Sequence, residues 1–296
     1  MKILLLGSNG QLGWELQRAL ASIGQLVAYS RKECNIEDFA TLRKLIEQVS
    51  PDIVVNATAY TAVDKAENDV DKAYLVNAEA VKVMAEACEQ GGAWLIHYST
   101  DYVFDGLKKS PYTESDIPNP LNIYGQSKLM GEEYIRKICS KHIIFRTSWV
   151  FSTRGRNFLK SIINKASEVD TLQIIDNQYG NPTSAELLAD VTANVLNKLA
   201  ARNGDSTFSG LYHLCCDGYT SWYAYAHYLL HRSQELGIIR TLPSLIPVTW
   251  QEYASVTQRP ENSRLDNSKI KNVFSLALPH WTFFLERTLQ EISNKG

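Results

Sequence analysis

Two residues whose types and spacing could support acid–base chemistry stand in the segment NIYGQSKLMGEEY, residues 122–134. Tyr124 and Lys128 are four residues apart, so in a helix their side chains share one face, about 6 Å apart along the axis. An ammonium group beside a phenol favours the phenolate and lowers the phenol pKa from about 10. The spacing therefore fits a proton donor with a cation that tunes it. Two solvent-exposed polar residues would have the same spacing, and the pair alone does not decide between these interpretations.

A glycine-rich segment at the start of the chain could hold phosphate groups. Residues 7–13 read GSNGQLG, after an apolar run and before a helical pattern. Gly7, Gly10 and Gly13 allow a tight turn, a close approach of backbone to pyrophosphate, and close packing of a helix on a sheet. Free N–H groups at the start of the helix would face the phosphates. The spacing is G-x-x-G-x-x-G instead of the usual G-x-G-x-x-G, but its strand–turn–helix context predicts dinucleotide binding.

The end of the second apolar run bears on which dinucleotide is bound. NAD enzymes usually have an acidic residue there, which holds the ribose 2′-hydroxyl. This chain has Ser30, Arg31 and Lys32 instead, and two cations suit a 2′-phosphate. We therefore expect NADPH. NADH is the alternative, because the same residues, with Glu33 beside them, could form an exposed basic turn that contacts no phosphate.

These residues need a scaffold that brings distant segments together, and the first half of the chain has the pattern of one. Short apolar runs such as KILLLG, DIVVNAT and AWLIHYS alternate with longer segments of helical periodicity. Such alternation indicates parallel βαβ units, and near-continuous apolar strands fit a sheet covered on both faces. We therefore predict a doubly wound parallel sheet of the Rossmann type in an α/β protein.

The pattern loosens after about residue 150. Helices are expected near 157–167, 184–201 and 221–236, with the short strand-like pieces LQIID and GLYHL between them. We expect a dinucleotide-binding Rossmann domain over 1–150. The remainder, 151–296, is expected to form a smaller mixed α/β lobe that mainly binds substrate, with some segments returning to the Rossmann core.

Composition excludes several classes of function. A net charge of −2 over 296 residues gives no basic field for nucleic acid or an anionic membrane, and no apolar run approaches a membrane-spanning length. Five scattered cysteines without a C-x-x-C motif indicate reduced thiols in a cytoplasmic protein. His227 and His231 have helical metal-ligand spacing, but Tyr228 stands where the zinc-protease motif needs Glu. The segment around Ser127 lacks the second glycine of a nucleophile elbow, which disfavours a serine hydrolase.

The glycine triplet together with Tyr124-x-x-x-Lys128 resembles the extended short-chain dehydrogenase/reductase superfamily. Within it, the chain is similar to the dTDP-4-dehydrorhamnose reductase family, from Lys2 to the C-terminal helix. The segments that carry this resemblance are VNATAYTAVDKAE, HYSTDYVFDG, NIYGQSKLMGE, FRTSWVF, DNQYGNPTSAELLAD and RPENSRL. The resemblance implies an oxidoreductase that reduces the C4 ketone of dTDP-4-dehydro-6-deoxy-L-mannose to dTDP-L-rhamnose, the last step of dTDP-rhamnose synthesis.

The resemblance also implies roles for single residues in this reaction. Tyr124 would give a proton to the carbonyl oxygen, Thr100 would hydrogen-bond the same oxygen, and Lys128 would lower the pKa of Tyr124 and hold the nicotinamide ribose. Besides the glycines and the basic turn, the cofactor would contact Asn9, Gly10, Gln11 and Leu12 at its pyrophosphate, Asn35 and Ile36 at adenine, and Ala59, Tyr60 and Thr61 at the nicotinamide ribose. Asn35 departs from the acid usual in the family.

Four further residues would face the nucleotide sugar by the same resemblance. Asp101 and Trp149 would contact the sugar, and Arg259 and Arg264 would bind the substrate's pyrophosphate through bidentate contacts. The structural alternatives are a core tryptophan and surface ion pairs, with a strand-end cap as the alternative for Thr100.

One position and three glutamates refine the resemblance. Related dehydratases follow Thr-Asp with a Glu needed for elimination, whereas this chain has Tyr102, so ketone reduction without dehydration is expected. Some family members bind Mg²⁺ between two subunits through glutamates. Glu15, Glu186 and Glu291 occupy the matching places and would bridge a homodimer, and carboxylates suit Mg²⁺. Three exposed helix glutamates are the alternative.

Two other functions remain open from the sequence. One is a non-catalytic, NADP-binding regulatory subunit of the methionine adenosyltransferase type, which the resemblance also includes. The other is a reductase of a different nucleotide sugar, because the sequence does not by itself distinguish thymine from other bases. Substrate-dependent oxidation of NADPH separates these alternatives from the first interpretation.

Overall fold

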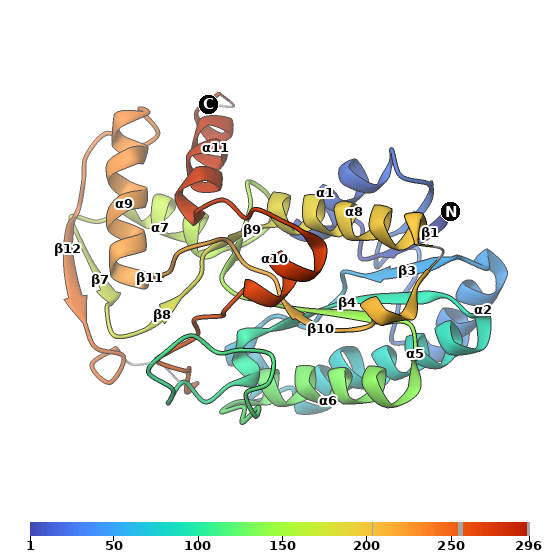
Figure 1. The fold of residues 1–296 in the computed structure, drawn as a ribbon. Coiled ribbons are helices and arrows are strands. Elements are labelled where there is room, and N and C mark those ends of the chain that lie inside the picture. Colours follow the sequence, from blue (N-terminus) through green and yellow to red (C-terminus); the bar gives the residue numbers. More distant parts are fainter. Residues whose placement is uncertain (203, 254–256, 295–296) are drawn as a thin grey trace.

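A six-stranded parallel sheet forms the centre of the protein (Figure 1), in a computed structural model that describes residues 1–202, 204–253 and 257–294. The strand order is β2-β1-β3-β4-β5-β10. The strands are β1 (Lys2–Leu6), β2 (Gln25–Tyr29), β3 (Ile53–Asn56), β4 (Trp94–Thr100), β5 (His142–Thr147) and β10 (Gly210–His213). Since the order reverses at β1, the crevice between the carboxyl ends of β1 and β3 is where a sheet of this kind binds ligands.

Helices cover both faces of the sheet, as the apolar strands predicted (Figure 1). One face carries α1 (Gln11–Leu20) and α8 (Ala185–Ala201), and the other carries α2 (Phe39–Val49), α5 (Ala80–Gly91) and α6 (Ile123–Ile138). In β1, Ile3 and Leu5 join the core on the α1 side, while Leu4 and Leu6 join the core beneath α2 and α5. This alternation confirms the doubly wound α/β prediction, because consecutive side chains of a strand point to opposite faces.

The segment between β3 and α5 is irregular and does not form one continuous helix. A short helix α3 (Val63–Ala66) precedes α4 (Val70–Tyr74), a π-helical turn (Leu75–Glu79) and then α5, which ends at the left-handed Gly92. In the π turn, the Asn77 side chain accepts from Tyr60 N at 2.9 Å and donates to Tyr60 O at 3.1 Å. The widened turn thus ties the helix to the loop that follows β3, and π turns often occur at functional sites.

The rest of the chain builds a mixed α/β lobe from three small sheets. Their pairs are β7 (Thr171–Ile175) with β12 (Ser244–Val248), β8 (Tyr179–Gly180) with β11 (Thr220–Ser221), and β6 (Val150–Phe151) with β9 (Thr183–Ser184). The helices are α7 (Phe158–Ala166), α9 (Trp222–Glu235), α10 (Ser268–Phe274) and α11 (Trp281–Ser293). Short 3₁₀ turns cover Asp101–Val103 and Ser206–Phe208. Two segments after residue 150 return to the Rossmann core: β10 pairs with β5, and α8 packs on α1. The division into a cofactor domain and a substrate lobe at residue 150 stays a prediction.

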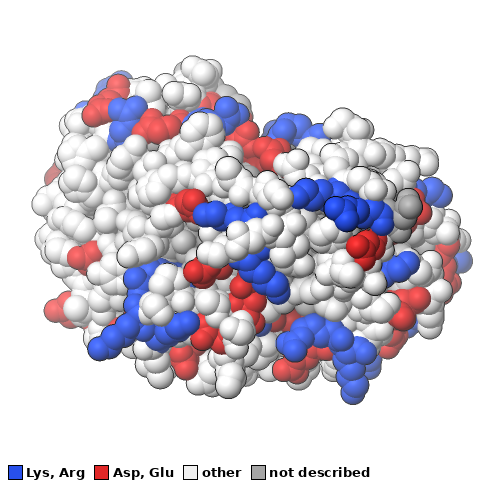
Figure 2. Space-filling view, in the orientation of Figure 1, with Lys and Arg blue, Asp and Glu red and all other residues white. Residues whose placement is uncertain are grey.

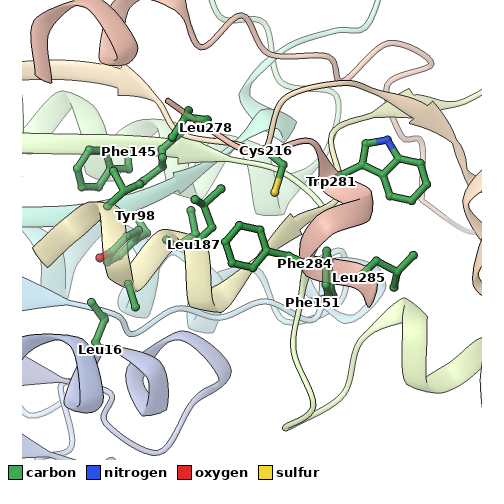
Figure 3. Close-up of a cluster of buried hydrophobic side chains, with 14 of the residues drawn as sticks. Leu16, Tyr98, Phe145, Phe151, Leu187, Cys216, Leu278, Trp281, Phe284 and Leu285 are labelled. Atoms are coloured by element: carbon green, nitrogen blue, oxygen red, sulfur yellow. The ribbon is translucent and has the colours of Figure 1, made fainter. Parts of the chain in front are cut away.

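The lobe and the sheet share one hydrophobic core. Figure 3 shows Leu16 of α1, Tyr98 of β4 and Phe145 of β5 in one cluster with Leu187 of α8 and Phe284 of α11. The same cluster includes residues of β7 and α9. The lobe is therefore held to the sheet by buried apolar contact. Among the helices in the described part of the chain, none has the length and apolar character that crossing a membrane requires.

Candidate active site

The glycine-rich turn after β1 has the geometry that close backbone approach requires. Gly7 has a φ of +86°, and a Cβ on it would lie 2.9 Å from the carbonyl oxygen of Ala57. A Cβ on Gly13 would lie 2.0 Å from the Gly7 carbonyl oxygen, so the first turn of α1 packs directly on the loop. Both positions require glycine, and the amino end of α1 is left open toward the crevice for an anion.

A cavity of about 240 Å³ lies beside this turn. Its walls include seven of the residues expected at the cofactor: Gly7, Asn9, Gly10, Arg31, Ile36, Ala59 and Tyr60. It also contains Lys72 and Val76 from the helix after β3. Glycine backbone on one side and apolar side chains on the other suit a nucleotide with a charged pyrophosphate. The residues present therefore fit a nicotinamide dinucleotide.

The other expected cofactor residues make contacts within the chain. Gln11 accepts from Asn157 Nδ2 at 2.8 Å and donates to Arg156 O at 3.3 Å, so it anchors the loop before α7. Ser30 donates its backbone N–H and its hydroxyl to Glu33, each at 2.8 Å. The remaining three are Leu12, which packs against the core, Asn35, whose Oδ1 accepts from Glu37 N, and the exposed Thr61.

Charged residues that the sequence reasoning missed stand at the ribose end of this cavity. Glu37 accepts from Arg31 Nη2 at 2.7 Å and from Lys72 Nζ at 2.8 Å. All three residues line the cavity. The basic turn pointed to Arg31, but nothing in the local pattern linked it to Lys72, which is about forty positions further along the chain. In this part of the cavity wall, the Glu37 carboxylate therefore holds two cations, Arg31 and Lys72.

Tyr124 lies in the first turn of α6, as its helix prediction required. Asn122 caps the helix by accepting from Gly125 N at 2.9 Å. Burial raises the pKa of Tyr124 to about 12, and a hydrogen bond with the Thr100 hydroxyl acts in the opposite direction. Thr100, at the carboxyl end of β4, also accepts from Tyr102 N at 3.2 Å, so it is a strand-end cap as well as a partner of Tyr124.

Lys128 lies one turn further along α6 and is 1% exposed. Its Nζ donates to the carbonyl oxygen of Tyr98 at 2.6 Å and lies 3.0 Å from Nε2 of His97. Burial lowers the pKa of Lys128 to about 8, while Glu132 acts to raise it. Burial thus dominates the pKa of Tyr124 in the cofactor-free protein, where Nζ of Lys128 bonds β4, and the expectation that Lys128 lowers the pKa of Tyr124 stays a prediction.

A second cavity, of about 340 Å³, lies between the Rossmann unit and the lobe. It is lined from one side by Val63, Tyr102 and Arg259, and from the other by aromatic, apolar and polar residues of α7, β7 and α9. The Tyr102 ring meets the Tyr124 ring edge to face, with centroids 5.7 Å apart. The wall of this cavity is thus in contact with the candidate proton donor.

The four expected sugar residues are placed differently. Arg259 lines the second cavity and forms an ion pair with Asp64 at 3.0 Å. Arg264 is not part of the cavity lining. Its guanidinium stacks on Tyr219 and donates to the carbonyl oxygen of Lys109. Asp101 is 3% exposed, and burial raises its carboxyl pKa to about 7. Trp149, with a φ of +47°, stacks on the cavity residue Trp222 with centroids 3.4 Å apart.

The three glutamates expected at a metal have partners within the chain. Arg18 contacts Glu15 at 3.3 Å, Arg287 contacts Glu186 at 2.8 Å, and Thr153 donates to Glu291 at 3.3 Å. Within residues 1–202, 204–253 and 257–294, no three His, Cys, Asp or Glu side chains form a group that could hold a metal ion. The residues of a single chain therefore do not fit a magnesium site.

Comparison with known proteins agrees with this geometry. The family model described as the RmlD substrate binding domain matches residues 1–294. The chain is 45% identical over 298 residues to the dTDP-4-dehydrorhamnose reductase of Escherichia coli K12, covering 99% of this chain and 98% of that protein. The dTDP-4-dehydrorhamnose reductase of Bacillus anthracis, solved in complex with NADP, has a TM-score of 0.86 at 30% identity and 98% and 99% coverage. The Clostridium acetobutylicum enzyme has a TM-score of 0.88 at 33% identity and 99% coverage of both chains.

Proposed function

The chain belongs to the RmlD substrate binding domain family, and from that premise we propose that it is an NAD(P)H-dependent reductase of dTDP-4-dehydro-L-rhamnose. The product is dTDP-L-rhamnose, so the reaction is the reduction step of dTDP-rhamnose biosynthesis. Relatives with 42% to 45% identity over nearly the whole chain carry the name of this reductase.

The observation that carries the proposal is that side-chain contacts connect the first turns of α6, which hold Tyr124, to the walls of both cavities. Asn77 bonds Tyr60, in the wall of the cofactor cavity, and also donates to Ser127 Oγ at 3.0 Å. Ser127 in turn donates to the carbonyl oxygen of Tyr124 at 2.8 Å. On the other side, Tyr102 of the second cavity packs on the Tyr124 ring. A proton donor fixed between a dinucleotide cavity and a substrate cavity is the arrangement that ketone reduction needs.

A nicotinamide cofactor held by the residues of the first cavity would supply a hydride to C4 of the sugar. The protein supplies the proton: the Tyr124 hydroxyl gives it to O4, so that the ketone becomes a secondary alcohol and Tyr124 becomes a phenolate. The Thr100 hydroxyl stabilises the developing negative charge, since its hydrogen bond already favours the ionised form of Tyr124. Burial of the site raises the cost of leaving that charge unpaired, so Tyr124 and Thr100 act together.

NADPH is the cofactor that the cavity favours. Arg31 and Lys72 are two cations at the ribose end, and a 2′-phosphate would compete with Glu37 for them. The related Bacillus anthracis reductase was solved with NADP. NADH lacks the phosphate and would leave the Arg31–Glu37–Lys72 set intact, so it remains the weaker alternative.

The test is to mix purified protein with NADPH and enzymatically made dTDP-4-dehydro-L-rhamnose and to follow the loss of reduced-nicotinamide absorbance. Tyr124→Phe should lower kcat roughly 10²- to 10⁴-fold while NADPH binding stays within about two-fold, because only the acid is removed. Tyr134→Phe is a matched control on the same helix, since its hydroxyl bonds the Glu79 carboxylate at 3.1 Å and should not affect turnover.

Two outcomes would contradict this proposal. Near-normal turnover by Tyr124→Phe would remove the proton-donor role. NADPH binding without sugar-dependent oxidation would favour a different nucleotide sugar or a non-catalytic cofactor-binding subunit.

Two further expectations are separate proposals. A magnesium-bridged homodimer is supported by the location of Glu15, Glu186 and Glu291 on helices α1, α8 and α11, and light scattering with and without a chelator would test it. A cytoplasmic location is supported by the five cysteines, which are all free and buried, and cell fractionation would test it.

A further inference from the structure

The loop between β6 and α7 is hydrogen-bonded to the first turn of α1, next to the glycine turn. Gln11 is the first residue of α1 and follows Gly10, which lines the cofactor cavity. Its Oε1 atom accepts from Asn157 Nδ2 at 2.8 Å and from Ser152 Oγ at 3.2 Å. Its Nε2 atom donates to the carbonyl oxygen of Arg156 at 3.3 Å. The oxygen and the nitrogen of one side-chain amide are thus both bonded to this loop.

Close packing holds the same loop on α1. Gly155 has a φ of +67°, and a Cβ on it would lie 2.8 Å from Cγ of Gln11. One residue earlier, the guanidinium of Arg154 lies over the ring of Trp14, with Cζ 3.5 Å from the ring centroid, as in a cation–π contact. Because hydrogen bonds, backbone packing and a stacked cation act together, the position of the loop depends on the position of the first turns of α1.

The start of α1 is the end of the helix that faces the cofactor. Its N-cap residue is Gly10, which has no side chain to accept a hydrogen bond from the first turn. The first N–H groups of a helix have no acceptor within the helix. A pyrophosphate bound beside Gly10 supplies acceptors to these groups, and it therefore holds the first turn of α1 in place.

The other end of the contact reaches the second cavity. Asn157 is the N-cap residue of α7, and its Oδ1 atom accepts from the backbone N–H of Lys160 at 3.0 Å. Four residues of α7 line the second cavity: Phe158, Ser161, Ile162 and Lys165. Since α1 covers the sheet and α7 belongs to the lobe (Figure 1), the contact between Gln11 and Asn157 joins the cofactor end of one helix to a helix that forms the substrate wall.

We propose that Gln11 is a positioning residue that couples the two cavities, so that a dinucleotide bound at the start of α1 raises the affinity of the second cavity for a nucleoside diphosphate. The bound pyrophosphate orders the first turn of α1, Gln11 transmits this order to Asn157, and α7 then holds its lining residues in place. Part of the ordering needed for substrate binding is complete before the substrate arrives, which makes the two binding events cooperative. The proposal rests on the proposed function for the identity of both ligands.

Electrostatic interaction between the ligands does not explain such a gain in affinity. Both ligands carry a pyrophosphate, so their direct interaction is repulsive and opposes joint binding. Figure 2 shows acidic and basic side chains interspersed over the face in view, and the fields of such neighbouring charges cancel over short distances. The gain therefore has to be transmitted by contacts within the protein, such as the bridge between Gln11 and Asn157.

The test is to measure the Kd for dTDP by calorimetry, with and without saturating NADPH. This ligand has the base and the pyrophosphate of the proposed substrate but no sugar, so it makes no direct contact with the nicotinamide and no turnover occurs. We expect the Kd of the wild-type protein to fall about ten-fold when NADPH is bound, within the range usual for coupled sites. By linkage, dTDP should lower the Kd for NADPH by the same factor.

Two variants remove the bridge from its two ends. Gln11→Ala removes the amide on α1, and Asn157→Ser removes the donor on the loop but keeps a good N-cap residue for α7. Each should reduce the effect of NADPH on the Kd for dTDP to less than about two-fold, and the double variant should show no further loss. Gln17→Ala is the matched control on α1, because Gln17 bonds the carbonyl oxygen of Ser8 at 2.8 Å and should leave the coupling intact.

A Kd for dTDP that is the same with and without NADPH in the wild-type protein would overturn the inference. The same conclusion follows if the full effect of NADPH persists in Gln11→Ala or Asn157→Ser, since a merely structural role weakens dTDP binding equally in both conditions. If Gln11→Ala does not fold, the wild-type protein and Asn157→Ser decide. A failure of dTDP to bind in either condition would contradict the proposed substrate and this inference with it, whereas binding that does not respond to NADPH contradicts this inference alone.

Discussion

The two cavities of this protein are built in different ways. All lining residues of the cofactor cavity lie between Gly7 and Val76, and its wall includes the backbone of Gly7, a position that requires glycine. The second cavity collects side chains from Val63, Tyr102, the segment 158–178, Trp222, Tyr253 and Arg259. The first cavity is thus built from one continuous segment that includes β1, β2 and β3, whereas the second exists only when the lobe has packed on the sheet. Substitutions in the cofactor cavity should therefore affect binding by displacing the backbone. Substitutions in the second cavity should affect binding by removing single side-chain contacts.

The largest effect is expected at the glycine turn. Gly13→Ala would add a Cβ at 2.0 Å from the Gly7 carbonyl oxygen, and no side-chain rotation relieves a clash between backbone atoms. We expect a loss of about 3 kcal/mol or more in the free energy of unfolding, with NADPH binding abolished in any folded fraction. Urea denaturation and fluorescence titration with NADPH measure the two effects.

Gly91 provides the matched control at the end of α5. A Cβ there would meet nothing within 4 Å, so Gly91→Ala should be neutral or stabilising by up to about 1 kcal/mol. Equal effects of the two substitutions would refute the view that close backbone packing defines the cofactor end.

The same contrast explains how far the sequence could predict the structure. The order of strands and helices in the first half followed from hydrophobic periodicity, because each element buries a face whose pattern is local. The π turn at 75–79 did not, since it depends on the bonds that Asn77 makes to Tyr60, seventeen positions away. The helices near 157–167, 184–201 and 221–236 were predicted correctly, but the packing of the first and the third as a cavity wall was not.

A second prediction concerns the side chains of the second cavity. Arg259→Ala should raise the KM for the nucleotide sugar roughly 10- to 100-fold with NADPH affinity unchanged, because it removes a charged group that can bind a pyrophosphate. Arg264→Ala should have a much smaller effect, because its guanidinium stacks on Tyr219 at 4.8 Å and lies outside the lining. Steady-state kinetics of the two variants compares them. A larger effect at Arg264 would mean that substrate binding rebuilds this wall.

Single residues of the site were predicted unevenly for a related reason. Tyr124 and Lys128 are visible as a spacing within one helix, and the glycines as a spacing within one turn. Lys72 and His97 carry no such signal, because their partners Glu37 and Asn56 are 35 and 41 positions away in the chain. The pKa of Tyr124 could not be predicted for a similar reason, because the burial that raises it to about 12 depends on how distant segments pack around the side chain.

A third prediction addresses the one part of the cofactor cavity that depends on side chains. Arg31→Ala should weaken NADPH binding about ten-fold and leave NADH binding nearly unchanged, because one charge-assisted contact to the 2′-phosphate is lost. Lys32→Ala is the control, since Lys32 belongs to the same basic turn but is not part of the cavity lining. Titration of both variants with the two cofactors gives the selectivity ratio. A ratio unchanged in Arg31→Ala would show that Arg31 does not distinguish the two cofactors.

A further prediction concerns a dependence of stability on pH that arises at Asp101, a buried carboxyl that accepts a hydrogen bond from Thr100. Burial raises the pKa of this carboxyl from 3.8 to about 7 in the folded protein. Between pH 4 and 7 the unfolded chain has therefore lost a proton that the folded protein keeps, and the contribution of Asp101 to the free energy of unfolding falls as the pH rises. Asp101→Asn cannot ionise, so its stability relative to wild type should increase through this window, by up to about 4 kcal/mol, and then level off above pH 7. Urea denaturation of both proteins at several pH values measures this difference. A difference independent of pH would mean that water reaches the Asp101 carboxylate in the free protein, so that the carboxyl keeps an ordinary pKa in spite of its burial.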